Sequence, residues 1–356
     1  MTEMNLLLAR NRFYKKNILL VALSILLGAV FVLSGFVKAV DPVGFSYKIE
    51  EYLRMFGWTE WHGAAIAFAV VLCAAEMILG LLLLSGLWRR LAAVAAFLFV
   101  SGFTVLTYVI YADPYGGINE CGCFGEAIHL SNGATLAKNV FLLLVAGVNL
   151  WQAFRAERCG FEVWQAGLAA GIVVLAFAVP LYACFYLPPF DFLPYGVGSK
   201  VERGGDLRWY DAGFNDVTEK MFAEGKPVYM VGMRSAMPSE AVERMAALYE
   251  AYRSGEIVLF AAASESGLTF PGGGDVSVCF MDGVVLKSLL RSRVGVVAFT
   301  AEGCIAGKWN LLHTPYRFTG GYGNELCGER RKQVVFFGVL AVMLFLLFYG
   351  RKKLVK

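Results

Sequence analysis

Six long apolar runs constrain the fold of this chain more than any other feature. The hydrocarbon core of a bilayer is about 30 Å thick, and about 20 apolar residues in a helix cross it. Runs that approach or exceed this length lie at 18–40, 64–85, 91–111, 136–154, 163–187 and 334–349. The composition agrees, because 58% of the residues are hydrophobic and only 17% are charged, against about 45–50% and about 25% in soluble domains. We therefore expect an integral membrane protein with six transmembrane helices.

Basic residues beside these runs indicate the orientation of the chain. Lys and Arg are enriched in the cytoplasmic loops of membrane proteins. Under six spans, four basic clusters fall on one side: Arg10–Lys16, Arg89/Arg90, Arg155/Arg158 and Arg351–Lys356. We therefore predict a multi-pass protein of the bacterial inner membrane with both termini in the cytoplasm. Since the basic residues flank the spans, they report topology, and we expect the lipid bilayer as partner and no nucleic acid.

The loop between the third and fourth runs carries the clearest chemical signal. In Asn119-Glu120-Cys121-Gly122-Cys123-Phe124-Gly125-Glu126, two cysteines stand one residue apart among glycines. Paired thiols on such a loop at a membrane face make a candidate redox or metal site. A disulfide across one residue is strained, and strained disulfides are the labile, oxidising ones. We predict that Cys121 and Cys123 are catalytic thiols, with a permanent disulfide from one of them to Cys184 or Cys327 as the alternative. Together with His129 they have no evident fourth ligand, and their short spacing is atypical of zinc, so no metal site is predicted.

Three ionisable residues within the apolar runs are further candidates for the site. Glu76 lies in mid-span, where an ionisable residue costs about 2.5–3.5 kcal/mol on insertion scales. It is either functional or a hydrogen-bonded structural carboxyl. Lys38 and Lys138 lie near the outer ends of their spans. They either extend to the lipid headgroups or approach the Cys121 loop, where a cation would lower the pKa of a thiol.

A short amphipathic segment follows the first run. Asp41 and Pro42 are typical of a helix start, with Asp as the N-cap and Pro at the first helical position. Phe45, Ile49 and Leu53 then recur at helical spacing. The pattern predicts a helix that either lies on the membrane surface or docks on the helical bundle.

Residues 190–332 change to the pattern of a soluble α/β domain. The apolar segments 227–231 and 257–263 predict buried strands, and 239–252 between them predicts a helix. Segments 294–300 and 304–309 predict a hairpin that turns at Glu302-Gly303. Strand, helix, strand and hairpin in this order are typical of a thioredoxin-like fold.

The catalytic parts of a thioredoxin are absent from this predicted domain. Its dithiol would follow the first strand, where the chain has Gly232-Met233-Arg234-Ser235-Ala236-Met237-Pro238, and its proline would fall near Val294. Without a thiolate there is no nucleophile for disulfide exchange. We therefore expect a degenerate domain that binds or positions a partner. Cys279 and Cys304 are expected to be buried free thiols, with a disulfide between them as the alternative in an oxidising compartment.

Three motifs in the first half of the chain resemble a known membrane family. The segment Ser34-Gly-Phe-Val-Lys-Ala-Val-Asp-Pro-Val-Gly-Phe45 resembles the first-helix signature of the DoxX family. Glu76 followed by Gly80-Leu-Leu-Leu-Leu84 resembles the second helix of that family. The Cys121-Gly-Cys-Phe-Gly125 loop resembles that of its methylamine-utilisation branch, the MauE-like proteins. The resemblance covers roughly 14–154 and implies a four-helix membrane bundle. It also implies an accessory factor linked to maturation of a disulfide-rich periplasmic dehydrogenase.

The layout is also similar to quinone-linked thiol oxidoreductases of the vitamin K epoxide reductase type. This similarity makes a quinone the candidate cofactor, although the chain lacks their Cys-x-x-Cys at a helix end. The predicted fold class is mainly α and polytopic. It combines a DoxX/MauE-like domain at 1–158, a fifth transmembrane helix within 159–189, an extracytoplasmic thioredoxin-like domain at 190–332, and a C-terminal helix with a basic tail at 333–356.

We expect a thiol-redox accessory protein that assists disulfide formation or maturation of extracytoplasmic client proteins, with thiol-disulfide oxidoreductase activity as an open question. Two alternatives remain. One is a non-catalytic scaffold whose outer domain recruits a partner. The other is a small-molecule carrier that uses Glu76, which would require a wet pathway to that residue.

Overall fold

The computed structural model divides the chain into a membrane unit and a second unit, which we name the outer unit after its predicted extracytoplasmic location. It describes residues 3–112, 130–155, 163–187, 195–201, 205–235, 237, 239–264, 268, 276–311, 338 and 341. The membrane unit comprises Met1–Leu181 and Phe337–Lys356, and the outer unit comprises Tyr182–Phe336. Within the described residues, five helices are long and apolar enough to cross a membrane. A multi-pass membrane protein is therefore confirmed, while the sixth predicted span lies almost entirely outside the described residues.

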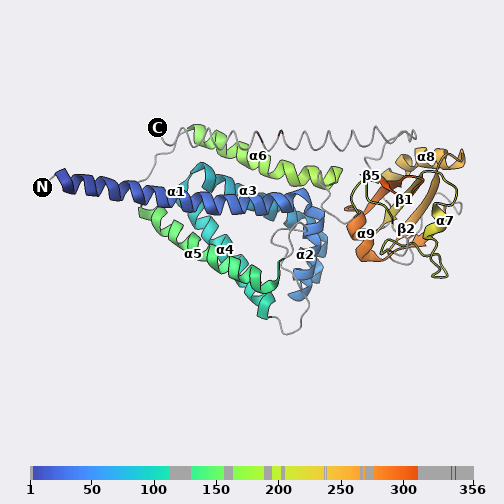
Figure 1. Cartoon of the computed structure of the whole chain (residues 1–356), viewed down its shortest axis with the longest axis horizontal. Coiled ribbons are helices and arrows are strands. Elements are labelled where there is room, and N and C mark those ends of the chain that lie inside the picture. The colour runs from blue at the N-terminus through green and yellow to red at the C-terminus, as the bar shows by residue number, and fades with distance from the viewer. Residues whose placement is uncertain are drawn as a thin grey trace. The chain divides into compact units, whose positions relative to one another are not determined.

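The five long helices begin and end near the predicted runs (Figure 1). They are α1 (Glu3–Val40), α3 (Ala65–Ser85), α4 (Arg89–Ala112), α5 (Asn132–Arg155) and α6 (Val163–Tyr186). The helix α1 begins well before its apolar window at Val21, because the basic residues ahead of that window also favour helix. Gly86 follows α3 with a φ of 75°, a left-handed conformation that ends the helix at little cost.

Glycines bring α1 and α3 into close contact. A Cβ atom added to Gly80 would lie 2.7 Å from the backbone nitrogen of Val32, and one added to Gly28 would lie 2.9 Å from the carbonyl oxygen of Gly80. Likewise, a Cβ atom on Gly35 would lie 2.9 Å from the backbone nitrogen of Met77. Small residues permit such an approach between membrane helices. The two backbones therefore run close enough for short polar side chains to bridge them.

The amphipathic helix α2 (Pro42–Met55) docks on the bundle. Its N-cap is Asp41, whose Oδ1 atom accepts a hydrogen bond of 2.8 Å from the backbone N–H of Gly44, as the sequence predicts. Phe45, Ile49 and Leu53 are all buried, and α2 packs mainly against α3. Figure 1 shows α2 beside the C-terminal end of α1. The docked interpretation is thus the correct one. The short helix η1 (Thr59–Ala64) then leads into α3.

The outer unit contains a five-stranded mixed sheet in the order β3-β2-β1-β4-β5. Its strands are β1 (Val228–Met233), β2 (Val258–Ala263), β3 (Val278–Phe280), β4 (Val294–Phe299) and β5 (Ile305–Asn310). Strand β1 is parallel to β2 and antiparallel to β4, while β3 is parallel to β2 and β5 is antiparallel to β4. The predicted strands and hairpin are confirmed, and Gly303 turns the hairpin with a φ of 82°. The sequence analysis missed β3, a strand of only three residues at the sheet edge.

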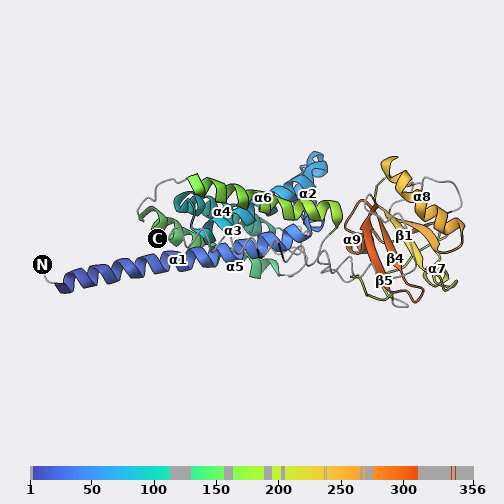
Figure 2. The same cartoon turned by 90° about the horizontal axis from the view of Figure 1, so that it is seen from above.

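Alternation along the strands builds a core on each face of this sheet. Val228 and Met230 of β1 contribute to one core, and Tyr229 and Val231 contribute to the other. Such alternation is the period of two expected of a strand buried on both faces. Figure 2 shows α8 (Ser239–Arg253) and α9 (Gly283–Leu289) on opposite faces. The helix α8 was predicted, whereas α9 and the single turn α7 (Thr218–Met221) were not.

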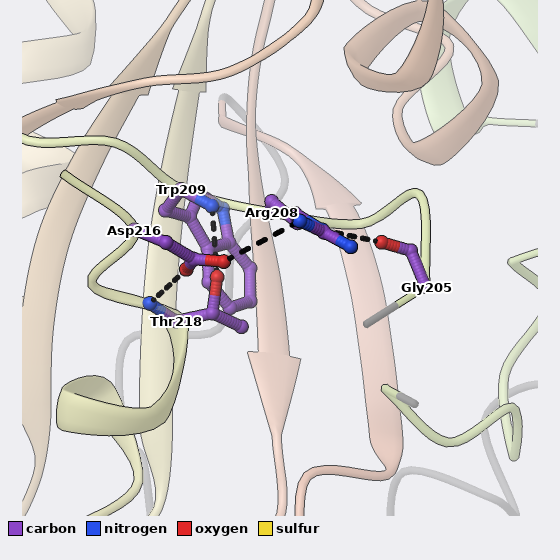
Figure 3. A network of polar contacts seen from close by, with 5 residues as sticks. All are labelled: Gly205, Arg208, Trp209, Asp216 and Thr218. Atoms are coloured by element: carbon purple, nitrogen blue, oxygen red, sulfur yellow. Dashed lines mark hydrogen bonds and ion pairs between the residues drawn. The ribbon is translucent and has the colours of Figure 1, made fainter. Parts of the chain in front are cut away.

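Trp209 anchors the core on the α9 face and is itself held by a polar network (Figure 3). Its backbone N–H donates to Oγ1 of Thr218 at 3.0 Å, and the backbone N–H of Thr218 donates to Oδ1 of Asp216 at 2.9 Å. Hydrogen bonds from the hydroxyl group and from the backbone N–H of Thr218 lower the pKa of Asp216. Arg208 lies at ion-pair distance from Asp216, 4.0 Å, and donates to the carbonyl oxygen of Gly205. The network fixes the irregular segment around Trp209, so that the indole ring of Trp209 reaches the core.

Candidate functional site

A buried ion pair joins α1 to α3 inside the membrane bundle. The Nζ atom of Lys38 lies 2.5 Å from Oε2 of Glu76, and the hydroxyl of Ser34 donates a 2.8 Å hydrogen bond to Oε1 of the same carboxylate. Lys38 is 2% exposed and Glu76 is 6% exposed. Both carboxylate oxygens therefore have a donor, which is what a charge removed from water requires.

The local sequence explains why these three side chains meet. Ser34 and Lys38 are four residues apart on α1, so they share one face of the helix. Gly35 lies beside them, and a Cβ atom there would lie 3.1 Å from Cβ of Glu76. Glycine at this position therefore allows α3 to bring its carboxylate within reach of both donors.

Two aromatic rings surround the ammonium group of Lys38. Its Nζ atom lies 5.2 Å from the ring centroid of Phe45 on α2 and 5.5 Å from that of Phe103 on α4. Both distances lie within the roughly 6 Å over which the face of a ring attracts a cation. The docking of α2 on the bundle thus supplies part of the environment of the buried lysine.

A cavity of about 40 Å³ lies next to the ion pair. Its lining residues come from four helices: Leu27, Val30, Phe31, Ser34 and Lys38 from α1, Glu76 from α3, Phe99, Val100 and Phe103 from α4, and Lys138, Asn139 and Leu142 from α5. Asn139 is buried and donates to Oγ1 of Thr107 on α4 at 3.2 Å. Lys138 is half-buried. The cavity is therefore lined by both polar and apolar side chains.

The structure brings together three of the five residues predicted from the sequence. Glu76, Lys38 and Lys138 all line this cavity. Lys38 is too deeply buried to extend to the headgroups, so that alternative is wrong for it. Cys121 and Cys123 lie outside the described residues, and their catalytic role stays a prediction.

Ser34 and Asn139 were not predicted as site residues. Ser34 begins the segment that resembles a first-helix signature and stands four residues before Lys38, and these are the sequence signals for its role. In the part of the chain that the structure describes, no three His, Cys, Asp or Glu side chains gather closely enough to hold a metal ion.

The cavity lies near the bundle end at which the predicted redox loop is attached. The helix α4 ends at Ala112 and α5 begins at Asn132, so residues 113–131 leave from and return to the same end of this helix pair. A helix rises about 1.5 Å per residue, which places Phe103 and Lys138 about 9–14 Å from these helix ends. The two thiols are thus carried on a segment that starts and finishes about two turns of helix from the cavity.

The cysteines Cys279 and Cys304 of the outer unit are free thiols. The prediction of buried free thiols is therefore confirmed for Cys279, whereas Cys304 is free but only partly buried, and the alternative of a disulfide between them is wrong. Cys279 is 2% exposed. Burial, with a smaller contribution from Asp211, raises the pKa of its thiol to about 11. A thiol with this pKa is protonated at neutral pH, so Cys279 is unsuited to disulfide exchange, which requires a thiolate.

Comparison with known proteins agrees with this architecture. Residues 16–152 match the family model described as methylamine utilisation protein MauE. The match extends from α1 into α5 and includes Lys38, Glu76 and Lys138. This part of the chain is a MauE-like membrane module, as its motifs predict. A search among curated proteins finds no match for the chain.

Proposed function

We propose that this protein is a thiol-redox accessory factor of the inner membrane that uses Cys121 and Cys123 to form or exchange disulfides in extracytoplasmic client proteins. The observation that carries the proposal is the buried pair of Lys38 and Glu76. Its cavity lies about two helical turns from the ends of α4 and α5, between which the two cysteines are located in the sequence. The match of residues 16–152 to the family model described as methylamine utilisation protein MauE supports the accessory role.

The chemistry of the proposal is a balanced exchange of two electrons and two protons. A thiolate of a reduced client attacks the Cys121–Cys123 disulfide, and a mixed disulfide forms as one loop sulfur leaves as a thiolate. The second client thiolate then attacks the mixed disulfide. The client gains a disulfide and the loop becomes a dithiol. An electron acceptor of the quinone class would reoxidise the loop.

Lys38 and Lys138, the two lysines near this end of the bundle, have different roles in this exchange. A loop sulfur that leaves as a thiolate is stabilised by nearby positive charge. Lys38 is engaged with Glu76, while Lys138 lines the same cavity from α5. We therefore assign the larger support of the thiolate to Lys138, and we assign the pair of Lys38 and Glu76 to the interior of the bundle.

The outer unit is proposed to be a degenerate thioredoxin-like domain that binds the client. Supporting this, β1 and β2 are parallel, β4 and β5 form an antiparallel hairpin, and β1 lies between β2 and β4. The end of β1 carries Arg234, whose backbone N–H donates to the carbonyl oxygen of Arg293 just before β4. A thioredoxin dithiol would follow this strand, and Arg234 and Ser235 occupy that position here. The domain would therefore position a client for the loop without reacting with it.

The scaffold and the carrier, the two alternative functions, require different properties of the protein. A scaffold needs only the surface of the outer unit, so it predicts no redox change at Cys121 or Cys123. A carrier needs a space next to Glu76 that admits its substrate, and the cavity of about 40 Å³ has room for only a few water molecules.

Trapping of a client on the loop tests the proposal. In membranes of the producing cells, Cys121→Ser should leave Cys123 able to hold a client as a mixed disulfide, which a non-reducing gel resolves and reductant releases. Alkylation of intact membranes should show the wild-type pair in both redox states. If both thiols stay reduced in an oxidising compartment and the double Ser variant supports client maturation like wild type, the proposal fails.

A further inference from the structure

The bundle cavity has the size and polarity of a hydrated site. A buried water needs about 10–15 Å³ of cavity volume and two to four polar partners. The cavity has about 40 Å³, so it can hold up to about three water molecules. Lys38, Glu76, Ser34, Asn139 and Lys138 supply polar atoms to its lining. Polar cavities of this size hold water, whereas purely apolar ones stay dry.

We propose that this cavity is a proton-exchange site inside the membrane, in which Glu76 is the group that binds and releases the proton. The Nζ and Oε2 atoms of the buried pair are 2.5 Å apart. A proton that passes along this contact converts an ammonium and a carboxylate into an amine and a carboxylic acid, so the net charge does not change. In the reverse direction the O–H bond of Glu76 breaks and the N–H bond of Lys38 forms again.

Water in the cavity connects the pair of Lys38 and Glu76 to Lys138. Hydronium can deliver a proton to the Glu76 carboxylate and leave as water, and the acid can return the proton by the same route. Lys138 lines the same cavity from α5 and is half-buried, whereas Lys38 and Glu76 are buried. The side of the cavity formed by Lys138 is therefore the one nearer the surface of the bundle.

The ionisable groups that face Glu76 come from three helices. The helix α1 contributes Lys38 as the nearest countercharge, and α5 contributes Lys138. On α3 itself, the buried thiol of Cys73 lies one turn before Glu76. The α4 residues that line the cavity, and Phe45 of α2 over Lys38, carry no ionisable group. Lys38 is therefore the nearest ionisable partner of Glu76, and Lys138 is the other lysine in the cavity lining.

The use of this proton rests on the proposed function. Closing a disulfide from two thiols releases two protons with two electrons, and opening it takes up the same number. A proton site about two helical turns from the ends of α4 and α5 would receive or supply protons as the loop cycles.

Infrared spectroscopy of the purified full-length protein in lipid nanodiscs tests the site directly. A pH titration should show the C=O stretch of a protonated carboxylic acid that is present in wild type and missing in Glu76→Gln. This band should shift within the dead time of mixing when H₂O is replaced by D₂O. Glu60→Gln is the matched control, because Glu60 is exposed on η1, and it should keep the band.

A second variant tests the water path without removing the acid. Leu142→Phe adds volume to the cavity wall, and the D₂O shift of the Glu76 band should then take at least ten times the dead time of mixing. Glu76→Asp keeps an acid and should move the band, which covers the case in which Glu76→Gln does not fold. The proposal is overturned if no Glu76-dependent band exists at any pH at which the protein stays folded. It is also overturned if Leu142→Phe exchanges as fast as wild type.

The infrared result and the trapping result are separable. The band is measured in the Cys121→Ser/Cys123→Ser double variant as well as in wild type. If the band is present in both proteins and the Cys121→Ser variant traps no client, the proton site is supported and the redox function is overturned. Client trapping without a Glu76 band supports the redox function and overturns the proton site.

Discussion

The Nζ atom of Lys38 lies 2.5 Å from Oε2 of Glu76, and this contact ties the C-terminal end of α1 to the middle of α3. The two residues are separated by 38 positions in the chain. The glycines on the facing helices let the backbones approach, and Ser34 completes the hydrogen bonding of the carboxylate. The pair thus belongs both to the packing of the bundle and to the proposed chemistry.

The first prediction is that the two charges depend on each other for stability. Lys38→Met leaves a buried carboxylate without its ammonium, and removing one partner of a buried pair costs about 3–5 kcal/mol. Adding Glu76→Gln to this variant should restore most of the loss, because no unpaired charge remains. Denaturant unfolding of the full chain in detergent micelles measures both.

Lys48→Met is the control for the first prediction. Lys48 also contacts a glutamate, Glu51, at 3.1 Å, but both side chains are partly exposed, 25% and 38%. Exposed pairs contribute about 0–1 kcal/mol, so this variant should unfold almost like wild type. Equal losses in the single and double variants at Lys38 would contradict the coupling.

The second prediction concerns the close approach of α1 and α3. A Cβ atom on Gly80 would lie 2.7 Å from the backbone nitrogen of Val32, so the helices must separate to admit Gly80→Ala. Overpacking of this kind costs about 1–3 kcal/mol. Thermal unfolding in detergent should show the loss, and Gly102→Ala should not. A Cβ atom on Gly102, in the interior of α4, meets nothing within 4 Å. Equal melting of the two variants would show that the glycine contact does not limit packing.

The transmembrane helices were predictable because their signal is local and strong. Each span is a continuous apolar run, and the start of α2 follows from Asp41 and Pro42 alone. The main strands of the outer unit were predictable for the same reason, since β1 and β2 are apolar runs on either side of a helix. The strand β3 and the helix α9 have only three and seven residues, which is too short for periodicity to be recognised.

The candidate site was predictable only residue by residue. The sequence marks Glu76, Lys38 and Lys138 as unusual because each is a charged residue in an apolar run. Nothing in the sequence says which faces of which helices meet, so the two lysines were expected either to extend to the lipid headgroups or to approach the Cys121 loop. The structure instead engages Lys38 with Glu76, because Gly35 and Gly80 allow α1 and α3 to approach. Ser34 and Asn139 escaped notice because small polar residues are common in membrane helices.

The third prediction concerns the core of the outer unit. Trp209 is fully buried, and its ring contacts Phe222, Phe260 and Phe299. Trp209→Ala should destabilise this unit by about 3–5 kcal/mol, the usual cost of removing a large core aromatic. Hydrogen exchange of β1 and β4 amides in the full chain should accelerate accordingly. Phe214→Ala is the comparison variant, because Phe214 is 81% exposed and its loss should change exchange little.

The last prediction follows from the buried thiol of Cys279 on β3. Burial raises the pKa of this thiol from 9.0 to about 11 in the folded protein. Between these two values the folded state keeps the proton, while the unfolded state has released it. The unfolded state therefore binds fewer protons, and the stability of the folded state falls as the pH rises. The stabilising effect is complete below about pH 9 and is lost as the pH approaches about 11.

Cys279→Ala removes this contribution without adding a charge. The difference in unfolding midpoint between wild type and Cys279→Ala should be constant below about pH 9 and should shrink above it, as wild type loses its advantage. Other groups that titrate in this range are common to both proteins and cancel in the difference. Hydrogen exchange of the β2 and β3 amides in the full chain gives the same comparison for this part of the sheet. A difference that stays constant through pH 11 would mean that Cys279 ionises in the folded protein as readily as in the unfolded chain.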